Sequence, residues 1–81
     1  MKKSIRFIAV ARKHKIGAAH ARFVIENNNA IRMPGRNEFE HRLFWTGIDD
    51  RGVELEIAGI EFEDEILIIH VMPMNFRRRQ V

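Results

Sequence analysis

One histidine inside an apolar run is the strongest lead to chemistry in this sequence. Residues 66–72 read Ile-Leu-Ile-Ile-His-Val-Met, so His70 is the one polar side chain among them, and residues 77–79 are all arginine. An imidazole can donate or accept a proton near neutral pH. Guanidinium groups can stabilise the negative charge that develops on a phosphate. Together they predict a metal-free ribonuclease, in which the 2′-hydroxyl of the RNA attacks the adjacent phosphate.

Individual residues can be given roles in such a reaction. His70 is our candidate for the general acid or base, with Arg42 and Arg77 as the cations that stabilise the phosphorane. Four further basic residues are candidates for RNA binding, namely Lys13, His14, Arg78 and Arg79.

Each of these residues also has a plainer interpretation. His70 could be a core histidine bonded to a backbone carbonyl, and His14 could lie at a helix end. The arginines at 77–79 could form a solvated tail, and Glu54 and Glu56 are most simply the exposed side of a hairpin.

The histidines do not predict a metal site. The four of them (His14, His20, His41 and His70) fall on four different expected elements, and none forms the i, i+4 or His-x-His pairs common in zinc sites. There is no glycine-rich phosphate loop either. We therefore expect neither a metal nor an organic cofactor.

Length and composition predict a single small globular domain over residues 1–81. The chain is 46% hydrophobic and has no cysteine, which fits a reducing compartment. No signal-cleavage pattern or long apolar run appears, so we expect a cytoplasmic protein that does not enter a membrane. The net charge is +3, residues 1–22 contain no acid, and the acids gather at 49–65. This split predicts a basic surface for RNA or an acidic partner.

The elements that would position these residues follow from periodicity. Residues 5–8 could form a short strand and residues 17–28 a helix, and the period then changes to two. We expect strands at 30–33, 41–48 and 53–62, with a tight connection at 49–52 and a β-bulge at Ala58-Gly59 where the apolar parity flips. Residues 66–72, apolar on both parities, predict a central strand ending at Pro73. Asn75 could cap a short basic helix.

The fold class predicted is therefore α+β. An N-terminal helical segment packs on a curved antiparallel sheet of about four strands, and a short basic helix ends the chain.

The order of these segments resembles the BrnT-type ribonuclease toxins of bacterial toxin–antitoxin systems, which have a RelE-like fold. The matching segments are Lys13-His14-Lys15-Ile16 before the helix, Arg42-Leu43-Phe44-Trp45-Thr46-Gly47, and Ile68-Ile69-His70-Val71-Met72 before the basic C-terminal residues. The chain differs from the family pattern at three positions: Lys15 replaces a glycine, His70 a serine and Met72 an arginine.

The resemblance implies an endoribonuclease toxin that cleaves RNA and is neutralised by a cognate antitoxin, as a homodimer or a toxin–antitoxin hetero-oligomer. Two alternatives remain open from the sequence. The same fold could bind nucleic acid without cutting it, or it could be a protein-interaction domain whose charge serves solubility.

Overall fold

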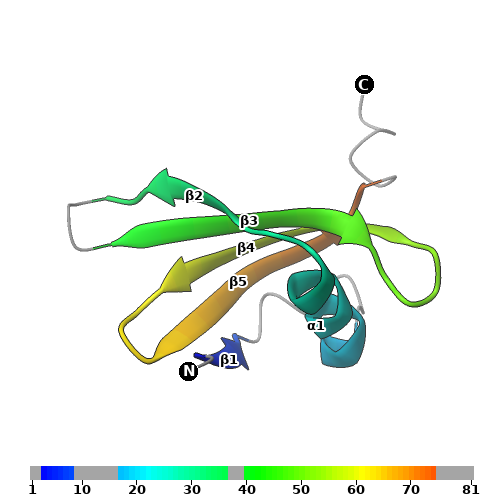
Figure 1. Ribbon diagram of the computed structural model, residues 1–81, viewed down its shortest axis with the longest axis horizontal. Helices are drawn as coiled ribbons and strands as arrows, with labels where there is room; N and C mark the ends of the chain where they lie inside the picture. Colours follow the sequence, from blue (N-terminus) through cyan, green and yellow to red (C-terminus); the bar gives the residue numbers. More distant parts are fainter. Residues whose placement is uncertain (1–2, 9–16, 37–39, 75–81) are drawn as a thin grey trace.

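The computed structural model describes residues 3–8, 17–36 and 40–74, which form one mixed sheet and one helix (Figure 1). In chain order the elements are β1 (Ser4–Phe7), α1 (Ala18–Asn27), β2 (Ile31–Pro34), β3 (His41–Ile48), β4 (Glu54–Glu61) and β5 (Glu65–Pro73). The five strands lie in the order β1-β5-β4-β3-β2. β1 runs parallel to β5, and the other neighbours are antiparallel.

The predicted fold class was wrong in three respects. The sheet has five strands rather than about four, it is mixed rather than antiparallel, and the described residues contain one short helix, Ala18–Asn27, in place of a larger N-terminal helical segment. The first strand is too short for its periodicity to identify it, and nothing in a strand's own sequence names its partner. Ile5 and Phe7 are the register partners of Ile66 and Ile68 in β5, and their side chains pack against the core. The predicted C-terminal helix lies outside the described residues.

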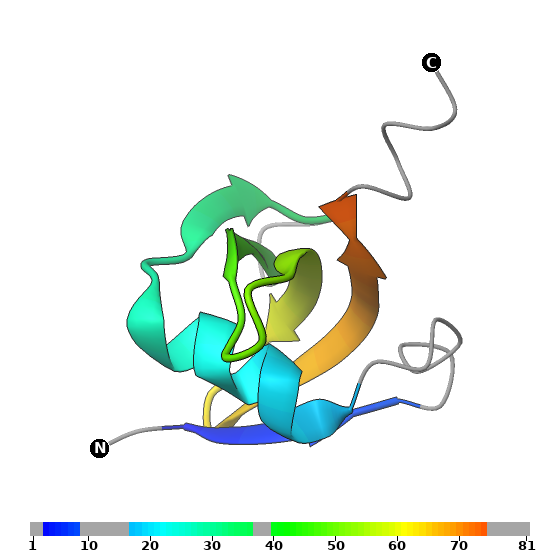
Figure 2. The same ribbon diagram turned by 90° about the vertical axis from the view of Figure 1, so that its right-hand side faces the viewer.

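The hydrophobic core lies between α1 and the face of the sheet that curls around it (Figure 2). Ala21 and Val24 of the helix pack against side chains from the three central strands. These sheet residues are Leu43, Trp45, Leu55, Ile57, Ile68 and Val71, each less than 5% exposed. Trp45, Ile57 and Val71 are direct cross-strand partners and share one face. We call this side of the sheet the concave face.

A β-bulge in β5 determines which side chains reach the core. Ala58 pairs with His70 and Gly59 pairs with Ile68, so Ile69 is the extra residue. The sequence predicted the irregularity at Ala58-Gly59 but placed it in the wrong strand, since β4 pairs with β3 without a shift. The extra residue reverses the parity of β5: Ile68 before it and Val71 after it both face the core. This reversal, as well as burial, explains why residues 66–72 are apolar on both parities.

The end of the helix packs directly on β3 at a glycine. The Asn28 side-chain nitrogen donates to the Val24 carbonyl at 2.9 Å, which satisfies a carbonyl of the last turn. A Cβ atom at Gly47 would collide with this same Asn28 amide. Gly47 therefore allows the helix end to approach the sheet.

The β3–β4 connection at residues 49–52 was predicted correctly, and Asp49 organises it. Asp49 is 4% exposed, and its carboxylate accepts from the backbone N–H groups of Arg51 (2.8 Å) and Val53 (3.0 Å). The Arg51 guanidinium donates to the other carboxylate oxygen at 2.7 Å. Gly52 takes φ = 85°, which a side chain would strain. Within the described residues, no helix has the length and apolar character needed to cross a membrane.

Candidate functional site

The side of the sheet turned away from α1 carries the candidate site. Its side chains come from the residues that alternate with the core positions, and we call it the distal face. Cross-strand pairing arranges them in rows: Phe44, Ala58 and His70; Thr46, Glu56 and Met72; and Arg42, Ile60 and Leu67.

His70 lies on this face and pairs with an acid of the neighbouring strand. Its Nε2 atom is 3.2 Å from Oε2 of Glu56, and the two side chains are 33% and 21% exposed. The bulge at Ile69 causes this placement, because unbroken alternation would put His70 on the same face as Ile68, in the core. The interpretation of His70 as a core histidine was therefore wrong.

Glu56 is the site residue that the sequence prediction missed. It was interpreted as the exposed side of a hairpin, yet it is only 21% exposed at its side chain and contacts His70. The two residues lie on adjacent antiparallel strands, two pairs apart in the register, and therefore in neighbouring rows of the same face. The contact could have been predicted only from the pairing register of β4 and β5, and that register depends on the position of the bulge.

Arg42 shares the distal face with His70, but its contact in the structure is with another acid. The Arg42 Nε atom lies 3.7 Å from Glu40 Oε2, and the Arg36 backbone N–H donates to the same carboxylate at 2.6 Å. The Arg36 hydrogen bond, with smaller contributions from the Arg42 and Arg36 charges, lowers the pKa of Glu40 despite some desolvation. The structure thus brings His70 and Arg42 to one face without joining them.

The other predicted site residues cannot be compared with the structure. Arg77, Lys13, His14, Arg78 and Arg79 lie outside the described residues. Met72 lies directly across from Glu56 on the distal face. Among the described residues of this region, the catalytic cation proposed from the sequence is therefore Arg42.

A second histidine–carboxylate pair lies at the N-terminal end of α1. His20 Nδ1 of α1 is 2.6 Å from Asp50 Oδ1 in the β3–β4 connection. Ligand atoms of His20, Asp49 and Asp50 come within 4.8 Å of one another. Burial alone would raise the pKa of Asp49, but hydrogen bonds from the Arg51 side chain and from the Val53 and Arg51 backbone lower it. Since Arg51 already compensates the Asp49 charge, we interpret this cluster as a tie between helix and hairpin.

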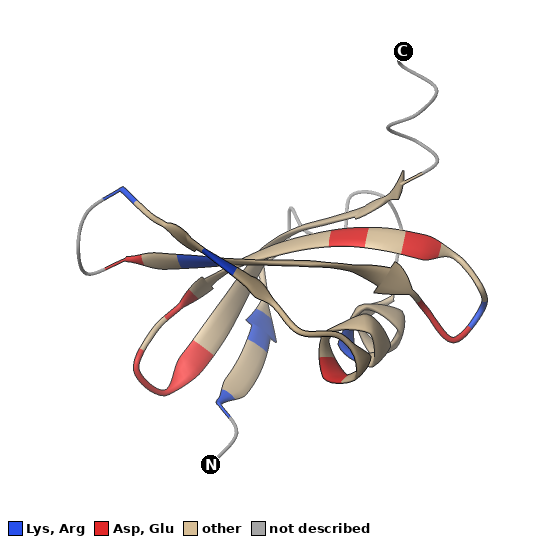
Figure 3. Cartoon of the chain, turned by 45° about the horizontal axis from the view of Figure 1, so that its top comes forward, with Lys and Arg blue, Asp and Glu red and all other residues tan. Residues whose placement is uncertain are grey.

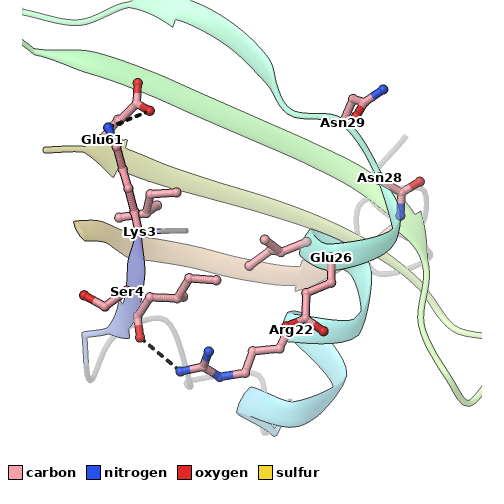
Figure 4. A pocket seen from close by; sticks show the side chains of 10 residues that line it. Lys3, Ser4, Arg22, Glu26, Asn28, Asn29 and Glu61 are labelled. Atoms are coloured by element: carbon pink, nitrogen blue, oxygen red, sulfur yellow. Dashed lines mark hydrogen bonds and ion pairs between the residues drawn. The ribbon is translucent and has the colours of Figure 1, made fainter. Parts of the chain in front are cut away.

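A hollow of about 660 Å³ opens on the concave side between α1 and β1 (Figure 4). Ile5, Ile25 and Ile66 line it together with charged and amide side chains. Its lining has no net formal charge, because Lys3 and Arg22 are matched by Glu26 and Glu61, and Lys3 Nζ lies 3.0 Å from Glu61 Oε2. Neither His70 nor Arg42 lines it, and we do not include it in the candidate site.

Acidic and basic positions are interspersed along the described part of the chain (Figure 3). Acidic positions gather near the two ends of β4, at its connections to β3 and β5.

Comparisons with protein-family models, with curated proteins and with solved structures return no match. We therefore infer the function from the residues themselves.

Proposed function

We propose that this protein is a metal-independent, toxin-like endoribonuclease whose acid–base group is the His70–Glu56 pair. The observation that carries the proposal is the bulge at Ile69, which turns His70 out of the core and to within 3.2 Å of Glu56. Bulges beside active sites commonly re-aim a side chain in this way.

The pair contains both groups that the cleavage needs. When the ring is protonated, a carboxylate proton acceptor lies next to an imidazolium proton donor. Glu56 would take the proton of the 2′-hydroxyl as its oxygen attacks phosphorus, and His70 would give a proton to the departing 5′-oxygen. The products are a 2′,3′-cyclic phosphate and a 5′-hydroxyl, so the protons balance without water or metal. The substrate phosphate would sit between the two side chains, which must separate to admit it.

Arg42 is our candidate for the charge-stabilising residue. It occupies the distal face two positions before Phe44, the cross-strand partner of Ala58 in the His70 row. Its guanidinium contacts Glu40 at 3.7 Å, a longer separation than a direct charge-assisted hydrogen bond. A phosphate anion competing for Arg42 would therefore displace a weak contact.

The resemblance to BrnT-type toxins supports a place for this activity in a toxin–antitoxin pair. The acid-free stretch at residues 1–22 and the arginines at 77–79 support a partner with acidic segments, which would compete with RNA for the same charge. We propose a cognate antitoxin as that partner.

The test is cleavage of single-stranded RNA in the presence of EDTA by the full chain and three variants. We expect His70→Ala and Glu56→Gln each to lower the cleavage rate about 10²- to 10⁴-fold. His20→Ala is the matched control, because His20 also contacts a carboxylate, that of Asp50, but lies on the helix and away from the distal face. It should leave the rate within about twofold of the parent under conditions where both proteins are folded.

Intact RNA after prolonged incubation with the parent protein would contradict the proposal. If the parent retained RNA with a salt-dependent affinity but did not cut it, the non-catalytic RNA-binding alternative would replace it. Equal rates for His70→Ala and the parent would remove His70 from the mechanism.

A further inference from the structure

The two edges of the sheet are treated differently by the fold. β1 forms one edge and β2 the other. The backbone N–H groups of Ser4 and Ile8 donate to the carbonyls of Asp64 and Ile68, so these two residues of the β1 segment face β5. Because successive residues of a strand direct their backbone groups to opposite sides, the N–H and C=O of Ile5 point away from β5. The Arg22 side chain of α1 donates to this outward Ile5 carbonyl at 3.0 Å. The helix thus satisfies part of the β1 edge.

The hydrogen bonds of β2 show in the same way which of its residues direct their backbone groups away from the sheet. Gly35 donates its backbone N–H to the Glu40 carbonyl at 3.0 Å, in line with the register that pairs Met33 with Arg42 and Ile31 with Phe44. Because hydrogen-bonded pairs alternate in an antiparallel ladder, Ile31 and Met33 direct their backbone groups to β3. Arg32 directs its N–H and C=O outward. Pro34 has no N–H, which limits how far a strand could pair along this edge.

The side chains around this edge are apolar on one face and cationic on the other. Ile31 is 63% exposed and Met33 48% exposed, both on the distal face. Arg32 points to the concave side, where its guanidinium lies 2.9 Å from Glu61. Lys3 also contacts Glu61, at 3.0 Å. Two cations therefore share one carboxylate, so the cluster of Lys3, Arg32 and Glu61 has a formal charge of +1.

We propose that the outer edge of β2 binds an extended segment of a partner protein with an apolar–acidic–apolar sequence. Such a strand would exchange backbone hydrogen bonds with Arg32 and place its acid opposite the Arg32 side chain. Its flanking apolar residues would then lie beside Ile31 and Met33, because neighbouring residues of a strand alternate between faces. A second copy of this chain fits less well, since its own β2 offers Arg32 and no acid.

This interaction does not depend on ribonuclease activity, because the β2 edge and the His70–Glu56 pair use different residues. It explains why a four-residue strand displays two large apolar side chains to solvent at the edge of the sheet. Isolated exposed apolar residues are common, but an exposed pair on an edge strand is a template for pairing.

The test is binding of two fluorescent peptides, Ser-Val-Glu-Val-Ser and Ser-Val-Lys-Val-Ser, to the full chain by anisotropy. We expect the glutamate peptide to bind more tightly and to shift the backbone amide signals of residues 30–33 in NMR spectra. Arg32→Glu should weaken the glutamate peptide about tenfold and make the lysine peptide the tighter ligand. This exchange of preference also shows that the variant is folded.

A matched pair of variants tests the apolar contacts. Ile31→Ser should weaken binding, whereas Ile48→Ser should not, because Ile48 is 60% exposed on the same face but lies on β3. Equal losses for both variants, or an unchanged peptide preference in Arg32→Glu, would overturn the proposal. A homodimer that Ile31→Ser dissociates and that the glutamate peptide does not would overturn it as well, since the occupant would then be a second copy.

Discussion

Two histidine–carboxylate pairs occur among the residues that the structure describes, and they differ in what surrounds them. His20 and Asp50 join the first turn of the helix to a hairpin connection, at 2.6 Å. His70 and Glu56 join adjacent central strands, at 3.2 Å, and sit among the apolar side chains of the distal face. The shorter contact is thus the one whose removal we expect to change the chemistry least.

A short contact between a histidine and an acid therefore does not by itself identify a catalytic site. His20 reaches Asp50 because the helix and the hairpin must be held together, and Asp50 is 47% exposed at its side chain. His70 reaches Glu56 because an extra residue in β5 turns it away from the core. An inserted residue costs a regular ladder hydrogen bond, and this cost is easier to explain at a functional position.

The largest expected effect is on the rate of RNA cleavage, and it separates the two pairs. We expect His70→Ala, Glu56→Ala and the double variant to reduce RNA cleavage by similar factors of about 10² to 10⁴, since the two side chains act as one unit. The corresponding cycle with His20→Ala and Asp50→Ala should show no coupling in the cleavage rate. Single-turnover cleavage rates of the six variants measure both cycles. Additive losses for His70 and Glu56 would show that they act independently.

Much of the local structure could be predicted from the sequence. The helix expected at 17–28 is Ala18–Asn27, and the strand expected at 41–48 is His41–Ile48. Residues 49–52 form the expected connection, because Gly52 supplies the positive φ that the turn requires. These features depend on residues that are close together in the sequence, so hydrophobic periodicity and turn composition are enough to predict them.

The features that could not be predicted depend on partners distant in the chain. Nothing in Ser4–Phe7 shows that it pairs in parallel with β5, about sixty residues later. The parity flip revealed an irregularity but not that Ile69 is the extra residue. Glu56 was missed for the same reason, because its contact with His70 exists only after the register between β4 and β5 is known.

The next largest effect concerns stability and separates the two acids of the β3–β4 connection. We expect Asp49→Ala to lower the free energy of unfolding by about 2 kcal/mol, because it leaves the Val53 backbone N–H and the Arg51 side chain without their acceptor. Asp50→Ala removes an exposed pair with His20 and should cost about 0.5 kcal/mol. Urea unfolding at pH 7 measures both. A larger loss for Asp50 would mean that the His20 pair, rather than Asp49, holds the helix to the hairpin.

The smallest expected effect is a dependence of stability on acid that neither histidine pair controls. A hydrogen bond from Lys3, together with the charges of Arg32 and Lys3, lowers the pKa of Glu61 against the opposing effect of burial. Asp49 also has a lowered pKa. The unfolded chain therefore takes up these protons first as the pH falls, so the stabilisation is complete above about pH 4 and is lost below it.

The matched variant for this acid dependence is Glu61→Gln. It should cost about 1 kcal/mol at pH 7 and flatten the fall in stability below about pH 4, because Glu61 is one of three carboxylates with a lowered pKa, the others being Asp49 and Glu40. Urea midpoints between pH 7 and pH 2.5 measure the effect, with His20→Ala as the control that keeps the parent's acid dependence. If Glu61→Gln kept the full slope and Asp49→Asn abolished it, the acid response would belong to the hairpin alone. The Lys3 and Arg32 contacts to Glu61 would then add little to the stability of the edge beside β2, and the net positive charge there would be available to a partner at almost no cost to the fold.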